Sequence, residues 1–304
     1  MQLSIVSPVY KSELTLNALV KSIQSAIDDI NLQYEIILVD DRSPDQSWSI
    51  INSLVAKVDE VKGIRLSRNF GQHAAITAGL QSAQGQWIVV MDCDLEDNPA
   101  HIPLLLKEAQ KGYDAVLVCR VNRQHSQLKQ LMSTLFYLVF SYLAGFKYNK
   151  SIGNFGIYSR KLICAVLSMG DSQKYFPAQV QWVGFKQKQI RLPHQGRYAG
   201  KSSYNLKKLI YLALNNILTF SEKPLRIIVV FGLLVSVSSF FLGLVYLVMG
   251  LLGFVKVSGF ISIIVGLFFS TGSIILVLGV IGLYLGKNFE ASKQRPTFVV
   301  DQII

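Results

Sequence analysis

The N-terminal part of the chain alternates short apolar runs with amphipathic segments. The runs predict strands, and the segments, whose apolar residues recur every three or four positions, predict helices. The predicted strands are residues 3–9, 35–39, 63–66, 87–91 and 114–118, and the predicted helices are residues 14–30, 47–58 and 72–83. We therefore expect an α/β fold with a mostly parallel sheet and helices on both faces, in which ligands bind beyond the carboxyl ends of the strands.

The C-terminal part follows a different pattern, because it is almost free of charge. No charged residue occurs between Arg226 and Lys256, or from Val257 to Gly286. Each stretch is about 30 residues long, whereas about 20 apolar residues suffice to span a bilayer core as a helix. Two such stretches in tandem predict two transmembrane helices rather than one buried core helix.

Basic residues flank this pair of predicted spans. They are Lys207, Lys208, Lys223 and Arg226 before the first span and Lys287, Lys293 and Arg295 after the second, whereas the turn between the spans carries only Lys256. By the positive-inside rule both termini are expected in the cytoplasm, with the protein in the inner membrane. The expected division is a cytoplasmic domain over 1–204, a juxtamembrane amphipathic helix over 205–225, and an anchor with a short cytoplasmic tail over 226–304.

Two further segments predict helices that touch the membrane surface. Residues 205–220 are basic at their start and apolar later, and residues 127–146 have one strongly apolar face. A helix buried in the core of the domain is an equally good interpretation of residues 127–146.

Composition narrows the class of partner. The formal net charge of +11 suits contact with anionic lipid headgroups and phosphorylated substrates, and no segment forms a recognised nucleic-acid-binding module. The first residues lack the basic region and cleavage site of a signal peptide. The 3 cysteines are far apart, so we expect neither a disulfide nor a cysteine metal site.

Acidic side chains follow two of the predicted strands. Asp40 and Asp41 end the second strand, where carboxylates either hydrogen-bond a base or ribose or cap the next helix. Asp92, Asp94 and Glu96 follow the strand 87–91 at alternate positions, so in extended backbone they would point to one side. Converging carboxylates suit Mg²⁺ or Mn²⁺ that also holds a diphosphate, and a solvated acidic turn is the alternative.

Several motifs occur in an order that is typical of one enzyme family. They are Ile5-Val6-Ser7-Pro8-Val9-Tyr10, Val39-Asp40-Asp41-Arg42-Ser43-Pro44-Asp45, Arg68-Asn69-Phe70-Gly71-Gln72, Asp92-Cys93-Asp94-Leu95-Glu96-Asp97-Asn98-Pro99 and Arg197-Tyr198-Ala199-Gly200-Lys201-Ser202-Ser203-Tyr204. These segments and the two C-terminal spans resemble the family 2 glycosyltransferases of the GT-A fold. Within that family the likeness is to the polyprenyl-phosphate glycosyltransferases, such as the bactoprenol glucosyltransferases and dolichol-phosphate mannose synthases.

The resemblance implies a GT-A (Rossmann-like) domain and a role for particular residues. The nucleotide pocket would be lined by Pro8, Tyr10, Glu13, Asp40, Asp41, Ser43 and Asp92. Mg²⁺ or Mn²⁺ would be held by Asp92, Asp94 and Glu96, and catalysis would depend on Asp92, Asp94 and Arg197. The acceptor phosphate would be bound by Arg120, Arg123, Lys129, Ser133, Arg197 and Lys201. For some of these residues the alternative is a basic surface that contacts anionic lipid.

The implied reaction is the direct, inverting transfer of a sugar from a UDP- or GDP-linked donor to a polyprenyl phosphate such as undecaprenyl phosphate. UDP-glucose is the expected donor, because it is frequent in the family. The lipid-linked product would serve cell-envelope glycans such as the O-antigen of lipopolysaccharide. Bactoprenol-type relatives suggest a homotetramer.

Three residues depart from the family pattern and leave alternatives open. Glu96 replaces the usual glutamine, and Asn154 and Gly156 replace the aspartate and arginine that are common in glucosyl and mannosyl enzymes. The alternative donor is therefore a modified amino- or deoxy-sugar, and the alternative function is that of an inactive lipid-carrier-binding or flipping component. A processive polysaccharide synthase is disfavoured, because Gln179-Val180-Gln181-Trp182 lacks the arginine of its Gln-x-x-Arg-Trp motif.

Overall fold

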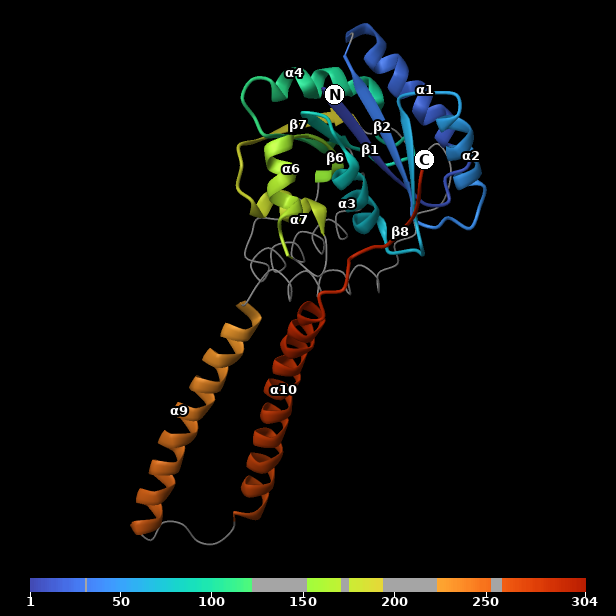
Figure 1. Ribbon diagram of the computed structural model, residues 1–304. Coiled ribbons are helices and arrows are strands. Elements are labelled where there is room, and N and C mark those ends of the chain that lie inside the picture. Colours follow the sequence, from blue (N-terminus) through green and yellow to red (C-terminus); the bar gives the residue numbers. More distant parts are fainter. Residues whose placement is uncertain (31, 122–151, 171–174, 194–222, 253–258) are drawn as a thin grey trace. The chain divides into compact units, whose positions relative to one another are not determined.

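The computed structural model describes residues 1–30, 32–121, 152–170, 175–193, 223–252 and 259–304 (Figure 1). The chain divides into two compact units. The first contains Met1–Leu138, Phe146–Asn205 and Arg295–Ile304, and the second contains Val139–Gly145 and Leu206–Gln294. The helices predicted over residues 127–146 and 205–220 lie outside the described residues.

An eight-stranded sheet organises the first unit. Its strands are β1 (Leu3–Val9), β2 (Tyr34–Asp40), β3 (Val61–Leu66), β4 (Trp87–Val90), β5 (Ala115–Val121), β6 (Ile152–Ser159), β7 (Gln187–Pro193) and β8 (Val300–Ile303). They lie in the order β7-β5-β6-β4-β1-β2-β3-β8. The strands β1 to β4 are parallel, whereas β6 is antiparallel to both neighbours and β8 is antiparallel to β3. The predicted α/β fold is confirmed, with a sheet that is parallel in its centre and mixed as a whole.

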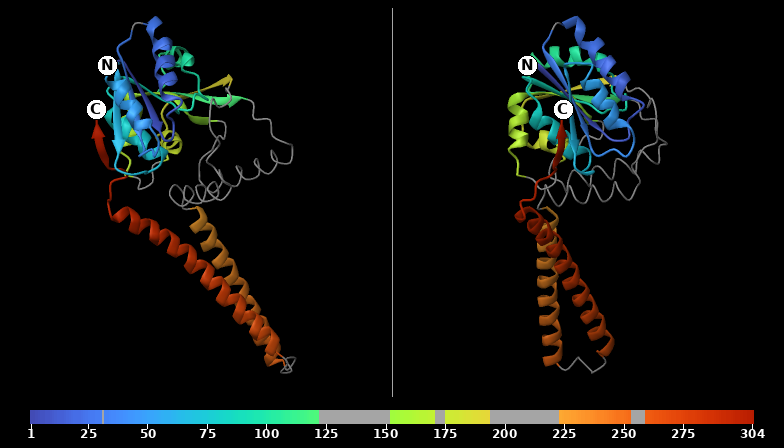
Figure 2. Two further views of the ribbon diagram at one scale, coloured as in Figure 1. Left: turned by 90° about the vertical axis from the view of Figure 1, so that its right-hand side faces the viewer. Right: turned by 45° about the vertical axis from the view of Figure 1, so that its right-hand side comes forward.

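Helices cover both faces of this sheet (Figures 1 and 2). On one face α1 (Leu16–Ile27), α2 (Ser47–Val55) and α4 (Ile102–Ala109) contribute to one apolar core. On the other face α3 (Gln72–Ser82), α6 (Arg160–Leu167) and α7 (Phe176–Trp182) contribute to a second core. The three predicted helices correspond to α1, α2 and α3, each shorter than its apolar pattern.

Alternate side chains of the central strands supply the two cores. On β2, Ile36 and Leu38 belong to the first core, and Ile37 and Val39 belong to the second. Successive residues of a strand point to opposite faces, so a sheet covered on both sides needs apolar residues at every position. This explains why continuous apolar runs, rather than alternation, revealed these strands in the sequence.

The second unit contains two long apolar helices, α9 (Lys223–Leu251) and α10 (Phe260–Ser292). Within them Lys223–Leu242 and Phe269–Ser292 are long and apolar enough to cross a membrane, and neither stretch is buried in the structure. Large apolar side chains such as Phe240 and Ile275 are mostly exposed. Exposed apolar surface of this kind favours a hydrocarbon environment, in agreement with the two predicted spans.

The C-terminal residues return to the sheet of the first unit, which the sequence patterns did not predict. The strand β8 pairs with β3, and the backbone N–H groups of Gly63 and Ile304 each donate to the other residue's carbonyl, at 3.0 and 2.9 Å. A Cβ atom on Gly63 would lie 2.8 Å from Cγ1 of Ile304, so the glycine makes room for this terminal side chain. The tail is therefore part of the sheet.

Candidate functional site

Three loops meet at the carboxyl edge of the parallel strands. The loop after β1 contacts the loop after β2, because the backbone N–H of Lys11 donates to Oγ of Ser43 at 3.2 Å. The same loop contacts the loop after β4, because Oγ of Ser12 lies 2.9 Å from Sγ of Cys93. Burial raises the pKa of Cys93 to about 11, so its thiol stays neutral and packs instead of reacting. The two acidic clusters thus lie at one edge of the sheet.

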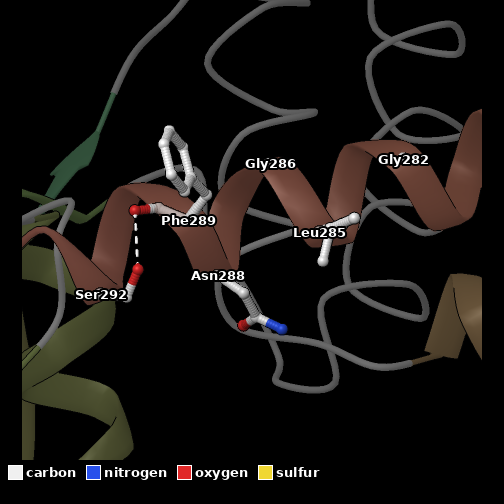
Figure 3. Close-up of a pocket in the computed structure, with 6 residues that line it drawn as sticks. All are labelled: Gly282, Leu285, Gly286, Asn288, Phe289 and Ser292. Carbon is white, nitrogen blue, oxygen red and sulfur yellow. Dashed lines mark hydrogen bonds between the residues drawn. The ribbon is translucent and has the colours of Figure 1, made fainter.

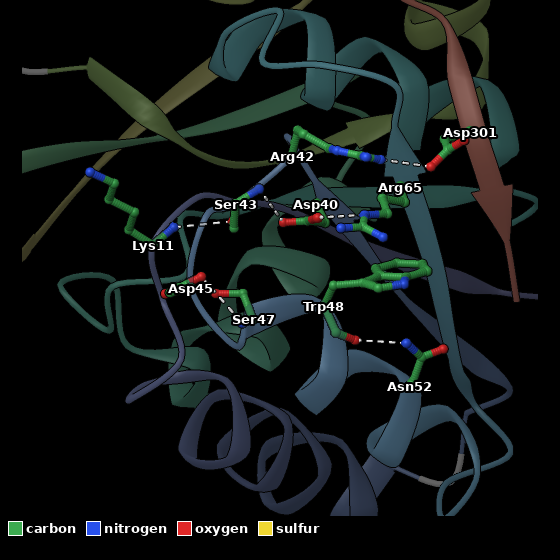
Figure 4. A network of polar contacts seen from close by, with 10 residues as sticks. All are labelled: Lys11, Asp40, Arg42, Ser43, Asp45, Ser47, Trp48, Asn52, Arg65 and Asp301. Atoms are coloured by element: carbon green, nitrogen blue, oxygen red, sulfur yellow. Dashed lines mark hydrogen bonds and ion pairs between the residues drawn. The ribbon is translucent and has the colours of Figure 1, made fainter.

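Asp40 ends β2 and is fully buried (Figure 4). Its Oδ1 accepts the N–H of Ser43 at 3.0 Å, whereas its Oδ2 is 3.6 Å from Nε of Arg65, beyond hydrogen-bond distance. Within the described part of the chain, this Oδ2 has no hydrogen-bond partner. Burial raises the pKa of Asp40, although the bonds from Ser43 and the charge of Arg65 oppose the rise. Nε of Arg65 is also buried without a hydrogen-bond partner among the described residues, so the two groups face each other as a buried ion pair.

Arg65 is itself held between Asp40 and an aromatic ring. Its guanidinium lies 5.4 Å from the ring centroid of Trp48 on α2, a distance typical of a cation–π contact. The ring of Trp48 lies beside the guanidinium of Arg65, which is directed toward Asp40 (Figure 4). Neither Arg65 nor Trp48 was among the residues predicted from sequence.

Asp41 holds two loops together. Its carboxylate oxygens accept the backbone N–H groups of Phe70 at 2.7 Å and Gly71 at 2.8 Å. Gly71 has a φ of 98°, which glycine adopts without strain, and α3 begins at the next residue. Burial raises the pKa of Asp41, and the two backbone bonds oppose this effect. The carboxylate predicted to line the nucleotide pocket therefore fixes the segment that precedes α3.

The remaining residues predicted for the nucleotide pocket surround the same edge. Pro8 is buried in β1, and Tyr10 is exposed immediately beyond it. Glu13 accepts the N–H of Gln46 at 2.9 Å and donates its own N–H to Asp45 at 3.3 Å. These contacts join the loops after β1 and β2 into one surface.

Arg42 connects this turn to the C-terminal strand. Its Nη1 donates to Oδ2 of Asp301 on β8 at 2.8 Å (Figure 4). The φ of Arg42 is 55°. Both side chains are 44% exposed, so the pair contributes at most about 1 kcal/mol. Sequence reasoning missed the pair, because no local pattern relates two residues that are 259 positions apart.

The acidic segment after β4 is a turn and not an extended strand. Leu95 has a φ of 60°, and Oδ1 of Asp94 accepts the backbone N–H of Glu96 at 3.1 Å. A side-chain bond of this kind closes a turn locally. The expectation that Asp92, Asp94 and Glu96 point to one side of extended backbone is therefore wrong.

Two amide side chains hold Asp92. Gln72, the first residue of α3, donates Nε2 to Oδ1 of Asp92 at 2.7 Å. Asn154 on β6 donates Nδ2 to the same oxygen at 3.1 Å. Gln72 is the last residue of the motif Arg68-Asn69-Phe70-Gly71-Gln72, and Asn154 is one of the three residues that depart from the family pattern. The sequence did not indicate that both contact Asp92.

The donor set of this turn fits a hard divalent cation only in part. Among the described residues, no three His, Cys, Asp or Glu side chains gather to hold a metal ion. The metal roles of Asp92, Asp94 and Glu96 stay predictions. Asp92 and Asp94 supply two hard oxygen donors from one turn, which fits Mg²⁺ or Mn²⁺ that takes its other ligands from substrate phosphates and water.

Gly156 occupies a position on β6 that has no room for a side chain. A Cβ atom there would lie 2.8 Å from the carbonyl oxygen of Val116 and 2.9 Å from Oη of Tyr158. Tyr158 is buried and donates its hydroxyl to the carbonyl oxygen of Asn154 at 3.3 Å. The lack of a cation at 156 is thus a consequence of packing against a tyrosine two residues away.

The residues predicted to bind the acceptor phosphate fall mostly outside the described part of the chain. Arg120 lies on β5, where its backbone is opposite Leu192 of β7. The predicted acceptor-binding residues that lie outside the described part of the chain are Arg123, Lys129, Ser133, Arg197 and Lys201. Their roles stay predictions.

A hollow on the second unit lies along α10 (Figure 3). It is lined by Gly282, Leu285, Gly286, Asn288, Phe289 and Ser292. None of these side chains titrates near neutral pH, and the hydroxyl of Ser292 donates to the carbonyl oxygen of Phe289 at 3.1 Å. We therefore place the chemistry at the sheet edge.

Known proteins share the sequence pattern along the whole chain. The family model described as Glycosyl transferase family 2 matches residues 4–170. The uncharacterized glycosyltransferase YkcC of Bacillus subtilis (strain 168) is 33% identical over 302 residues, covering 99% of this chain and 94% of that protein. The undecaprenyl-phosphate 4-deoxy-4-formamido-L-arabinose transferase of Serratia proteamaculans (strain 568) is 31% identical over 310 residues, covering 100% of this chain and 94% of that protein.

A solved structure has a similar fold. It is glucosyl-3-phosphoglycerate synthase from Mycobacterium tuberculosis in complex with Mn²⁺, uridine diphosphate and phosphoglyceric acid. The TM-score is 0.52 at 17% sequence identity, over 72% of this chain and 76% of that chain. At this identity the likeness concerns the fold alone, and it agrees with a mixed sheet flanked by helices.

Proposed function

Because the chain belongs to glycosyl transferase family 2, we propose that it transfers a sugar from a UDP-linked donor to undecaprenyl phosphate at the cytoplasmic face of a membrane. The observation that carries the proposal is that the turn after Asp40 and Asp41 and the acidic turn of Asp92 and Asp94 lie at one edge of the sheet. Likeness to undecaprenyl-phosphate transferases over the full length of the chain supports the acceptor.

Each acidic group has a distinct part in this proposal. Asp40 supports the turn that receives the base through its contact with Ser43, and Asp41 keeps the neighbouring loop in place. Asp92 and Asp94 would hold Mg²⁺ or Mn²⁺, which when bound neutralises the negative charge of the leaving diphosphate. A phosphate monoester is already anionic near pH 7, so the acceptor needs alignment more than a strong base. Direct displacement at the anomeric carbon then inverts its configuration.

Connectivity of the sheet supports the proposed membrane topology. The strand β7 precedes the two apolar helices and β8 follows them, yet both strands belong to the same sheet. A chain that crosses a bilayer through these helices must therefore leave and return on one side. The lysines and arginines that flank the helices on that side favour the cytoplasm.

We favour a modified sugar over glucose as the group transferred. Several relatives are named as transferases of 4-deoxy-4-formamido-L-arabinose, at 29–31% identity over nearly the whole chain. The amide of Asn154 and the packed Gly156 also replace the aspartate and arginine that are common in glucosyl and mannosyl enzymes. Both observations point away from UDP-glucose, the donor expected from family frequency.

A donor comparison tests this function. Purified full-length protein is incubated with undecaprenyl phosphate, Mn²⁺ and either UDP-glucose or UDP-linked 4-deoxy-4-formamido-L-arabinose, and UDP release and lipid products are measured. We expect UDP release that requires both the lipid and the cation, stops with EDTA, and is faster with the modified sugar.

Other results would contradict one part of the proposal each. Faster transfer of glucose would overturn the choice of sugar. Several sugars on each lipid would indicate a processive synthase, and no UDP release with either donor would support an inactive lipid-carrier-binding component.

The C-terminal strand gives a further prediction. Asp301→Ala removes the carboxylate that holds Arg42, so the nucleotide turn becomes less ordered. We expect the KM for the donor to rise by up to about fivefold, the equivalent of one exposed ion pair, with little change in kcat. Glu290→Ala, which breaks an exposed pair with Lys287 in α10, is the matched control. An unchanged donor KM in Asp301→Ala would show that β8 does not support the turn.

A further inference from the structure

Gln72 and Asn154 approach Asp92 from two different elements, α3 and β6. Their amide groups donate to one oxygen, Oδ1, at 2.7 and 3.1 Å. Rotation of the carboxylate about its Cβ–Cγ bond would break both hydrogen bonds. The pair therefore fixes the direction in which the Asp92 carboxylate faces.

Asn154 is itself fixed by the packing of β6. Its carbonyl oxygen accepts the hydroxyl of Tyr158, whose ring occupies the space that Gly156 leaves empty. The residues on either side of Gly156, Phe155 and Ile157, are buried in the core on the opposite face of the sheet. The amide at 154 is thus attached to a rigid strand.

Building on the proposed function, we propose that Asn154 and Gln72 are positioning residues, which orient Asp92 toward the divalent cation and the donor diphosphate. Both side chains are neutral donors, and hydrogen bonds to the charged form of a carboxylate stabilise that form. A carboxylate at 154 would instead place a second negative charge against the same oxygen. Asparagine at this position avoids that repulsion and keeps the hydrogen bond to Asp92.

Metal affinity tests the pair separately from catalysis. Mn²⁺ binding to full-length protein saturated with UDP is titrated by electron paramagnetic resonance for Asn154→Ala, Gln72→Ala and the double variant. We expect each single change to weaken Mn²⁺ binding about tenfold, as is typical when a ligand loses an outer partner. Both amides act on one oxygen, so their effects should not be independent. The loss of Mn²⁺ affinity in the double variant should therefore differ by at least about threefold from the product of the losses in the two single variants.

Three comparisons separate positioning from a merely structural role. Asn154→Asp keeps the size of the side chain but should weaken Mn²⁺ binding more than Asn154→Ala. Excess Mn²⁺ should restore turnover in Asn154→Ala, which it would not do for misfolded protein. Gln187→Ala is the control. Gln187 is the first residue of β7, and its amide donates to the carbonyl oxygen of Val180 at 2.8 Å, so this variant loses an amide hydrogen bond that does not involve Asp92.

The outcomes distinguish this inference from the proposed function. Unchanged Mn²⁺ affinity in both single variants would overturn the positioning role. So would a loss of Mn²⁺ affinity in the double variant that agrees within threefold with the product of the two single losses. A different outcome would support the positioning role and overturn the proposed function. In that outcome the wild-type protein binds Mn²⁺ in the presence of UDP and the variants weaken this binding as expected, yet the wild-type protein transfers no sugar.

Discussion

Replacement of Asp94 by asparagine is expected to lower the rate of sugar transfer about a thousandfold, a loss typical of removing a group that stabilises charge in a transition state. The substitution removes the charge but keeps the shape. The Asp94 side chain accepts the N–H of Glu96 at 3.1 Å, and the amide oxygen of asparagine can accept the same bond. The turn should therefore keep its conformation while its affinity for a cation falls.

The measurement for Asp94→Asn combines initial rates of transfer with thermal unfolding. We expect an unfolding temperature close to that of the wild type, so that the lost rate reports on chemistry. Asp59→Asn removes an exposed carboxylate elsewhere and should leave both quantities unchanged. A wild-type rate in Asp94→Asn would rule out a metal role for this residue.

Replacement of Gly156 by arginine, the residue that the glucosyl and mannosyl enzymes commonly have there, should destabilise this protein by at least about 4 kcal/mol. The new Cβ atom would lie 2.8 Å from a backbone oxygen of β5, which cannot move without disturbing the sheet. The guanidinium would also enter a region filled by the buried ring of Tyr158. Overpacking and burial of an unpaired charge both oppose folding.

A graded series makes the Gly156 prediction independent of one failed variant. Gly156→Ala adds only the Cβ atom and should lower the stability by about 1–3 kcal/mol, measured as the shift in thermal unfolding. Gly170→Arg is the control, because no atom of the described residues beyond its chain neighbours lies within 4 Å of a Cβ built there. Wild-type yield and unfolding temperature for Gly156→Arg would show that β6 can adapt, and that packing does not exclude a cation at this position.

The acidic turn shows where sequence patterns reached their limit. The order of strands and acids placed Asp40 at the end of β2 and Asp92 just beyond the end of β4, as found. The geometry inferred for the second cluster was wrong, because alternation implies one face only in extended backbone. A bond from Asp94 to Glu96 and the positive φ of Leu95 turn the chain instead. Such short-range competition between side chain and backbone is not visible in a hydrophobic pattern.

Partners that lie far apart in the sequence were equally invisible. Asn154 was noticed only as a departure from a motif, and its contact with Asp92 depends on β6 lying antiparallel beside β4. The antiparallel placement of β8 beside β3 likewise brings Asp301 to Arg42. The sequence showed a short tail after the second apolar stretch but gave no sign that this tail completes a sheet.

The sequence by itself determined the strands β1 to β5, the helices α1 to α3, the two long apolar helices, the family and the edge of the sheet at which the acids gather. These features follow from local periodicity and from short motifs, which neighbouring residues specify together. The tertiary structure alone decided the mixed sheet, the amide pair on Asp92, the packing that excludes a side chain at 156 and the return of the C-terminal strand. Each of these depends on which distant segments lie side by side, and that is settled by the packing of the whole domain.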